Sequence, residues 1–233
     1  MKKTLLSLCL VLCGTLSALS FDPKGRVDVG AAYFNIRVLE NREPIQEMDL
    51  WGGRADATIL PISGSGIALK PTIYGAGKGT DDFFGTGIAI GHYTPILKRL
   101  CLLPAIGYTY TELGTRITLE TPFGPLTGVK ERFRSNSLFV SADLQLKLKE
   151  SLYATGIFQY AWASSTTTLT HENLPKQRFK GNSSGPGVAL VLDYYFRKNW
   201  SLSVAAGYNR SLDDALFGIE GFGLKIGLAY CFY

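Results

Sequence analysis

Apolar and polar residues alternate strictly along the stretch from Ser137 to Lys149. One parity is entirely apolar, and it consists of Leu138, Val140, Ala142, Leu144, Leu146 and Leu148. Successive side chains of a β-strand point to opposite faces, so this period predicts a strand with one apolar face. The length fits the roughly 9–11 tilted residues that cross a bilayer, whereas strands of soluble domains average about five or six.

A comparable pattern recurs along the chain, with almost no helical periodicity between the segments. The ten predicted strands cover residues 26–40, 49–61, 67–77, 86–96, 100–113, 133–149, 152–168, 185–196, 200–210 and 218–233. The sequence therefore predicts an all-β fold, a transmembrane antiparallel up-and-down β-barrel of ten strands. A count of eight, with a misread strand among residues 67–113, is the alternative.

The connections between these strands alternate in length. The links after the second, fourth, sixth and eighth strands are about two to five residues long. The other links are predicted as loops, at residues 41–48, 78–85, 114–132, 169–184 and 211–217. Short periplasmic turns and long outer loops are typical of outer-membrane barrels, and an even strand number puts both termini in the periplasm.

The parity opposite to the apolar face carries most of the charged residues. The predicted lumenal set is Arg54, Asp56, Lys70, Asp143, Gln145, Lys147, Asp193 and Lys225. Ten strands lie near the barrel size whose interior is filled by side chains, and buried charges must pair. We therefore expect an ionic network that plugs the lumen or leaves a narrow pore. A soluble barrel would instead turn the Leu138–Leu148 face inward around an apolar ligand.

Aromatic residues gather near the ends of the predicted strands. The candidate interfacial set is Trp51, Tyr160, Trp162, Tyr194, Phe196, Trp200, Tyr208, Tyr230 and Phe232. Amphipathic rings at both ends of an apolar band are typical of the two membrane–water interfaces.

The final segment, GFGLKIGLAYCFY, places Phe222, Leu224, Ile226, Leu228, Tyr230 and Phe232 on one face. In this it resembles bacterial outer-membrane β-barrel proteins of the small, OmpA-like or opacity-like type. The resemblance implies that the last strand is the signal read by the barrel-assembly machinery. Tyr233 lies one position beyond this register, so Phe232 is the candidate terminal aromatic.

The N-terminus has the pattern of a secretory signal. Lys2 and Lys3 precede an apolar stretch, Leu5–Leu16, and Ala18-Leu19-Ser20 supplies small residues for cleavage. We expect a signal peptide at 1–20 and a barrel domain at 21–233; acylation at Cys13 is the alternative. Loss of Lys2 and Lys3 leaves 22 basic and 19 acidic residues, a net charge of +3 that does not indicate nucleic-acid binding.

Catalytic and metal-binding signals are weak. His92 is expected on the lumenal face, and His171 beside Glu172 in an outer loop. A rim enzyme would need His171 near an acid such as Asp213, and a metal site needs three or four clustered ligands. We predict no catalytic residues, no metal and no cofactor. Cys101 and Cys231 are expected as free thiols on opposite walls.

Charged groups in the predicted outer loops suggest surface contacts. Asp81-Asp82 and Asp213-Asp214 are paired acids, and Lys176, Arg178 and Lys180 form a basic run. Solvated loop residues are the favoured interpretation of both groups, and contact of the basic run with anionic headgroups or a host polyanion is the alternative.

The leading hypothesis is an outer-membrane barrel with a structural or surface-interaction role. Its expected partners are outer-membrane lipid, lipopolysaccharide, the assembly machinery and a surface ligand that the sequence does not identify. The alternatives are a narrow pore for small solutes, a rim enzyme using His171, and a soluble secreted ligand binder.

Overall fold

The computed structural model describes residues 24–61, 65–121, 124–172 and 174–232, so the predicted signal segment 1–20 and Tyr233 lie outside the described residues. The strands are β1 Gly25–Glu40, β2 Glu43–Ile59, β3 Ile67–Lys78, β4 Asp81–His92, β5 Thr94–Leu97, β6 Leu100–Thr121, β7 Gly124–Lys149, β8 Leu152–His171, β9 Leu174–Arg197, β10 Trp200–Leu212 and β11 Gly218–Phe232. Within the described residues no helix is long and apolar enough to span a membrane.

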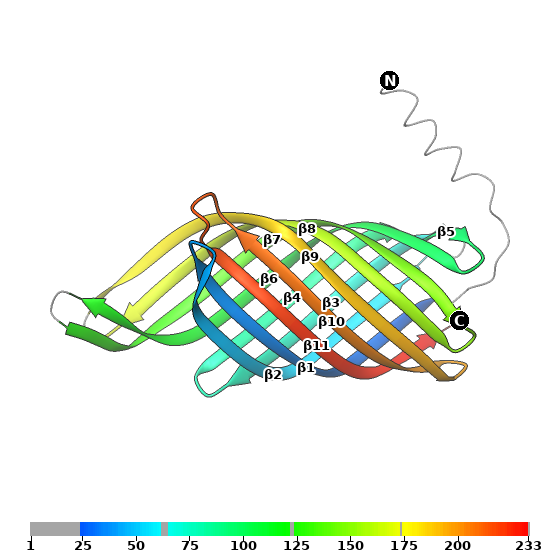
Figure 1. Ribbon diagram of the computed structural model, residues 1–233, viewed down its shortest axis with the longest axis horizontal. Coiled ribbons are helices and arrows are strands. Elements are labelled where there is room, and N and C mark those ends of the chain that lie inside the picture. The colour runs from blue at the N-terminus through cyan, green and yellow to red at the C-terminus, as the bar shows by residue number, and fades with distance from the viewer. Residues whose placement is uncertain (1–23, 62–64, 122–123, 173, 233) are drawn as a thin grey trace, which may run out of the picture.

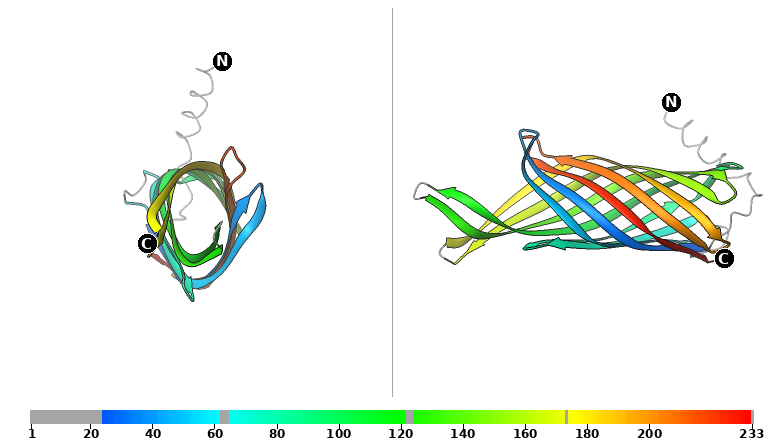
Figure 2. Two further views of the ribbon diagram at one scale, coloured as in Figure 1. Left: turned by 90° about the vertical axis from the view of Figure 1, so that its left-hand side faces the viewer. Right: turned by 60° about the horizontal axis from the view of Figure 1, so that its bottom comes forward.

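The strands form a closed ring of antiparallel neighbours (Figures 1 and 2). Except for β4 and β5, each strand pairs with the next along the chain; β1 pairs with β11, and β4 pairs with β6. The short β5 also pairs with β6, and it continues the position of β4 in the ring after a break at Tyr93. Because β4 and β5 share one position, the ring has ten strand positions, as predicted, and the count of eight is wrong.

The hairpins at the outer end have longer strands and tighter turns than the sequence predicted. β1 and β2 pair up to Glu40 and Glu43, so the predicted loop 41–48 shrinks to Asn41 and Arg42. Both turn residues have positive φ, 52° and 69°, as a two-residue hairpin turn of the primed type requires. Pro44 misled the prediction, because it sits beside a register shift in the ladder.

The two longest predicted loops are also wrong. Residues 114–132 and 169–184 are almost entirely strand, and they extend the β6–β7 and β8–β9 hairpins far beyond the rim (Figure 1). β7 has 26 residues and β9 has 24. About 10 residues suffice to cross a bilayer, so roughly half of each strand stands outside it. The two remaining predicted loops, 78–85 and 211–217, likewise contain parts of β4 and β10.

The apolar face points away from the barrel axis. Leu138 is 58% exposed on β7, and Ile106 on β6 and Phe158 on β8 are 62% and 58% exposed. An apolar wall of this kind on a closed ring suits lipid, because a closed barrel pairs the backbone groups of its strands within the protein. The soluble alternative, which needed this face to line a pocket, is wrong.

His92 lies on the face opposite to the one predicted. It is exposed and shares its parity with Ile88 and Ile90, which are 52% and 56% exposed on the outer wall. Its Nδ1 lies 2.9 Å from Oγ1 of Thr94. The prediction ran one strand through Tyr93, where the wall in fact breaks, so the faces were interchanged.

The lumen contains two layers of side chains. Toward the outer end an apolar cluster is formed by Ile36, Met48, Leu50 and Leu113. Phe34, Val38, Ala76, Phe83, Phe133 and Ile219 pack against it. Toward the periplasmic end, which carries the short turns, the inward positions are ionisable.

Candidate functional site

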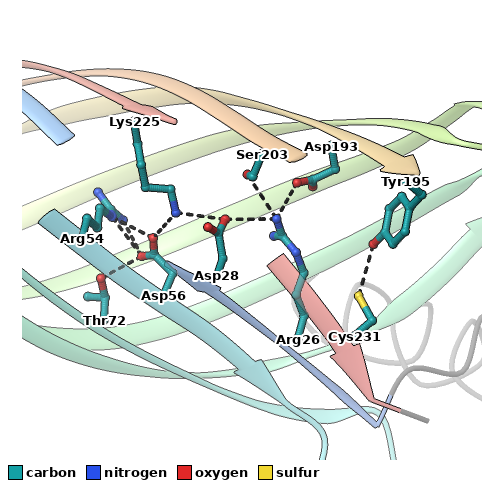
Figure 3. A network of polar contacts seen from close by, with 10 residues as sticks. All are labelled: Arg26, Asp28, Arg54, Asp56, Thr72, Asp193, Tyr195, Ser203, Lys225 and Cys231. Atoms are coloured by element: carbon teal, nitrogen blue, oxygen red, sulfur yellow. Dashed lines mark hydrogen bonds and ion pairs between the residues drawn. The ribbon is translucent and has the colours of Figure 1, made fainter. Parts of the chain in front are cut away.

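Charged side chains form one connected network in the periplasmic half of the lumen (Figure 3). We call these residues the lumenal network: Arg26, Asp28, Arg54, Asp56, Asp193 and Lys225. They project from β1, β2, β9 and β11, and strand alternation turns them inward because their neighbours in sequence face outward. Three cations and three carboxylates balance the charge.

Lys225 holds the centre of the network. Its Nζ lies 2.9 Å from Oδ2 of Asp28 and 2.8 Å from Oδ2 of Asp56, and its side chain is 6% exposed. Asp56 also accepts hydrogen bonds from Arg54, at 2.8 Å to Nη2, and from the Thr72 hydroxyl at 2.7 Å. Each buried charge thus has opposite charges around it, which offsets the cost of removing it from water.

Arg26 connects the network to the far wall. Its Nη2 lies 3.1 Å from Oδ2 of Asp28, donates to Asp193, and lies 3.2 Å from Oγ of Ser203. β1 and β9 are separated in the ring by β11 and β10, so the Arg26–Asp193 contact crosses part of the lumen. Asp28 is shared by Arg26 and Lys225, and it therefore joins the two halves of the network.

A second ionic contact links other walls of the barrel. Lys70 on β3 donates to Oδ2 of Asp143 on β7, and β4 and β6 lie between these strands. Both side chains are largely buried, at 22% and 9% exposed.

An aromatic group separates the charges from the apolar cluster above them. The guanidinium carbon of Arg54 lies 5.9 Å from the ring centroid of Tyr74. The Tyr74 ring packs against Phe83 at 5.2 Å, and Phe83 packs against Phe34 at the same distance. Charged, aromatic and aliphatic layers thus follow one another along the barrel axis.

The structure brings together six of the eight predicted lumenal residues as ion pairs, in the two groups described above. Gln145 and Lys147 lie nearer the periplasmic end. Gln145 accepts a hydrogen bond from the Tyr93 hydroxyl at 3.3 Å, and Lys147 pairs with Glu150 at 2.8 Å.

Sequence reasoning missed Arg26 and Asp28. Both are the polar members of the alternation Arg26-Val27-Asp28-Val29, which can be seen in the sequence. The ambiguous parity around Tyr33 left the inner face of this strand unassigned. In the structure Val29 is 57% exposed and Asp28 is 2% exposed.

The predicted interfacial aromatics lie on the outer wall at two levels. Eight of them are exposed, from 38% at Tyr208 to 66% at Trp51, and Phe232 is half-buried. The rings of Tyr160 and Trp162 contact edge to face toward the outer end, with centroids 5.0 Å apart, and those of Trp200 and Tyr230 do the same near the termini, also at 5.0 Å.

The candidate chemical groups are dispersed. His171 ends β8 on the extended hairpin, whereas Asp213 belongs to the turn between β10 and β11. Among the described residues, no three His, Cys, Asp or Glu side chains are grouped so as to hold a metal ion. Cys101 and Cys231 are free, and β6 and β11 stand five strands apart in either direction around the ring.

Comparison with known proteins supports the fold. No protein-family model and no curated protein sequence matches the chain. The outer membrane protease OmpT from Escherichia coli is similar in structure, with a TM-score of 0.65 and 16% identity over 93% of this chain and 99% of that one. The translocator domain of the autotransporter NalP from Neisseria meningitidis is also similar in structure. Its TM-score is 0.51 and its sequence identity 10%, over 98% of this chain and 94% of that one.

These likenesses show the fold, which hosts different functions in different proteins. The protein is a ten-stranded β-barrel of the outer-membrane type. Together with the apolar outer wall, this fold places it in a bacterial outer membrane.

Proposed function

We propose that the protein is a closed outer-membrane barrel that serves in surface interaction, and that the wall formed by β6, β7, β8 and β9 is the part that interacts. One observation carries the proposal. Charged, aromatic and aliphatic side chains occupy the lumen in successive layers, while these four strands extend beyond the rest of the barrel (Figures 1 and 2).

The filled lumen favours display over conduction. The Lys225 contacts draw β11 toward β1 and β2, and Leu50 above them is completely buried. A solute would have to displace paired charges and then an apolar cluster, and both steps oppose passage.

Planar-bilayer recording tests the closed lumen. Purified protein is first shown to be folded by an electrophoretic band that shifts on boiling, and it is then inserted into a bilayer. We expect no stable single-channel steps. Stable steps from protein of verified fold would support the narrow-pore alternative and overturn this part of the proposal.

Cysteine labelling tests the display of the extended wall. In a Cys101→Ser, Cys231→Ser background, Thr127→Cys places a thiol in the β6–β7 extension, and Glu150→Cys places one in a short turn. We expect a membrane-impermeant maleimide to label Thr127→Cys on intact cells and Glu150→Cys only after permeabilisation. The reverse pattern would overturn the assigned orientation.

A further inference from the structure

Basic side chains are arranged in cross-strand rows on the outward face of the extended wall. Arg134 on β7 pairs in register with Thr166 on β8, and Thr166 pairs with Lys180 on β9. Arg132, Thr168 and Arg178 form the same arrangement two residues further out. We call these six residues the basic rows.

In each row a threonine lies between two basic residues, one on each neighbouring strand. Neighbouring strands are about 4.8 Å apart, so the backbones of β7 and β9 are about 10 Å apart. Threonine is short and the flanking side chains are long. A phosphate between the two cations of a row would therefore receive charge-assisted hydrogen bonds from both sides and a neutral one from the threonine hydroxyl.

The arginines on β7 are held in place by one carboxylate. Nε of Arg132 and Nε of Arg134 each lie 3.1 Å from Glu112 on β6, and both arginine side chains remain more than half exposed. Tyr110 in turn donates a hydrogen bond to Glu112. The guanidinium groups are therefore positioned by the protein while much of their surface remains free.

The charge on this face is strongly unbalanced. On the described outward positions at 110–118, 130–136, 164–170 and 178–182, Glu112 is the sole carboxylate. The same positions carry six cations, Arg116, Lys130, Arg132, Arg134, Arg178 and Lys180.

The opposite flank of the barrel differs. There Arg37 lies between Glu47, at 3.0 Å, and Glu220, at 3.6 Å, and Arg210 lies 3.9 Å from Glu220. These two arginines are thus neutralised by neighbouring carboxylates, whereas the six cations on the β6–β9 side share one.

The basic rows begin directly above the apolar belt. Leu138 and Trp162 pair in register and are 58% and 52% exposed. Arg134 stands four residues beyond Leu138, which is about 10 Å along the membrane normal for tilted strands. The headgroup region of one leaflet is about 5–8 Å thick, so the Arg134–Lys180 row stands just beyond it, and its long side chains reach back to the phosphates.

We propose that the basic rows bind the phosphate groups of the anionic glycolipid, lipopolysaccharide, that surrounds the barrel in the outer leaflet. The rows face sideways and continue the lipid-facing belt, which favours a membrane lipid over a soluble polyanion. This inference rests on the proposed surface-interaction role and names its ligand class.

The test compares phosphorylated lipid A with its chemically dephosphorylated form. Full-length protein refolded in zwitterionic detergent is titrated with each, and binding is measured by native mass spectrometry. We expect wild type to prefer the phosphorylated form, and the preference to weaken as salt rises. Arg134→Ala/Lys180→Ala and Arg132→Ala/Arg178→Ala should each weaken binding about tenfold, the effect of removing two exposed cations.

Matched variants separate a specific site from general charge. Arg37→Ala/Arg210→Ala removes two outward arginines on the other flank, where carboxylates neutralise them, and should leave binding unchanged. Arg134→Lys/Lys180→Arg retains the charges and should retain most of the binding. All variants should still shift on boiling, since the substituted groups lie outside the barrel interior.

The proposal is overturned if the dephosphorylated form binds equally well, or if the Arg37→Ala/Arg210→Ala control loses as much affinity as the row variants. Stronger competition by soluble inorganic polyphosphate than by lipid A would assign the rows to a free polyanion and reject the lipid source. The recordings and labelling described above do not depend on these residues, so failure here is distinguishable from failure of the proposed function.

Discussion

Nζ of Lys225 lies 2.8 Å from Oδ2 of Asp56, although β1 separates β11 from β2 in the ring. The same Nζ also contacts Asp28 on the intervening strand. One side chain therefore ties the inner faces of three neighbouring strands together. The contact spans the junction between β1 and β11, where the N-terminal and C-terminal strands close the barrel.

We predict that Lys225→Met destabilises the barrel by about 3 kcal/mol, because its removal leaves three buried or half-buried carboxylates with only two cations, Arg26 and Arg54. The measurement is reversible urea unfolding in lipid vesicles. Lys149→Met, at an exposed position, should change stability by less than about 0.5 kcal/mol. Equal effects of the two substitutions would contradict a stabilising role for the lumenal network.

Leu50 provides a test of the apolar layer. It is fully buried in the lumen, so Leu50→Ala should cost about 3 kcal/mol through lost packing and the cavity left behind. Ile45 on the same strand is 57% exposed beyond the barrel, and Ile45→Ala should be close to neutral. A small effect at Leu50 would mean that this layer is loosely packed, and the closed-lumen interpretation would lose support.

Alternation sufficed to predict the barrel because its two sides have opposite chemistry. Residue types showed that the Leu138–Leu148 face is apolar, and the aromatic positions, the final strand and the secretory signal favoured lipid over a soluble core. The ten-strand count followed from the turns. The prediction failed where the alternation of apolar and polar residues ends although the strand continues. Beyond the membrane both faces of a strand are wet, so residues 114–132 lose their apolar periodicity and resemble a loop, although the ladder between β6 and β7 continues through them.

The candidate sites were predictable to different degrees. Lys225 and Asp56 stand out as charges within apolar strands, but which cation contacts which carboxylate depends on strand order and on the reach of the side chains. The basic run at Arg178 and Lys180 was visible in sequence, whereas its alignment with Arg132 and Arg134 depends on the register of β8 between them. Residues about fifty apart in sequence give no local signal of such a row.

The three tryptophans allow the membrane boundaries to be measured. Trp51 and Trp162 are exposed toward the outer end, and Trp200 is exposed near the termini. We expect single-tryptophan variants to be quenched more strongly by lipids labelled near the headgroup than by lipids labelled at mid-chain, because indole rings prefer the interface. Stronger mid-chain quenching at any of the three would move that boundary.

Glu112 links the basic rows to a measurable titration. The hydrogen bond from the Tyr110 hydroxyl is the largest cause that lowers the pKa of Glu112, and Arg134 and Arg132 lower it further. A carboxylate whose pKa is lower in the folded protein stabilises the fold above its unfolded pKa. That contribution is lost as the pH falls through the folded value. Glu112 should therefore stay ionised, and keep both arginines positioned, in mildly acidic surroundings.

We predict that Tyr110→Phe and Arg134→Gln each raise the pKa of Glu112, because the tyrosine hydroxyl and the guanidinium both lower it in the folded protein. The measurement is a carbon-13 NMR titration of glutamate carboxyls in the refolded protein. Glu131 on the inward face of β7 is an internal control, since burial rather than these partners raises its pKa. A Glu112 pKa that both substitutions leave unchanged would show that the carboxylate does not hold the arginines, and the rows would then lack their pre-positioned guanidinium groups.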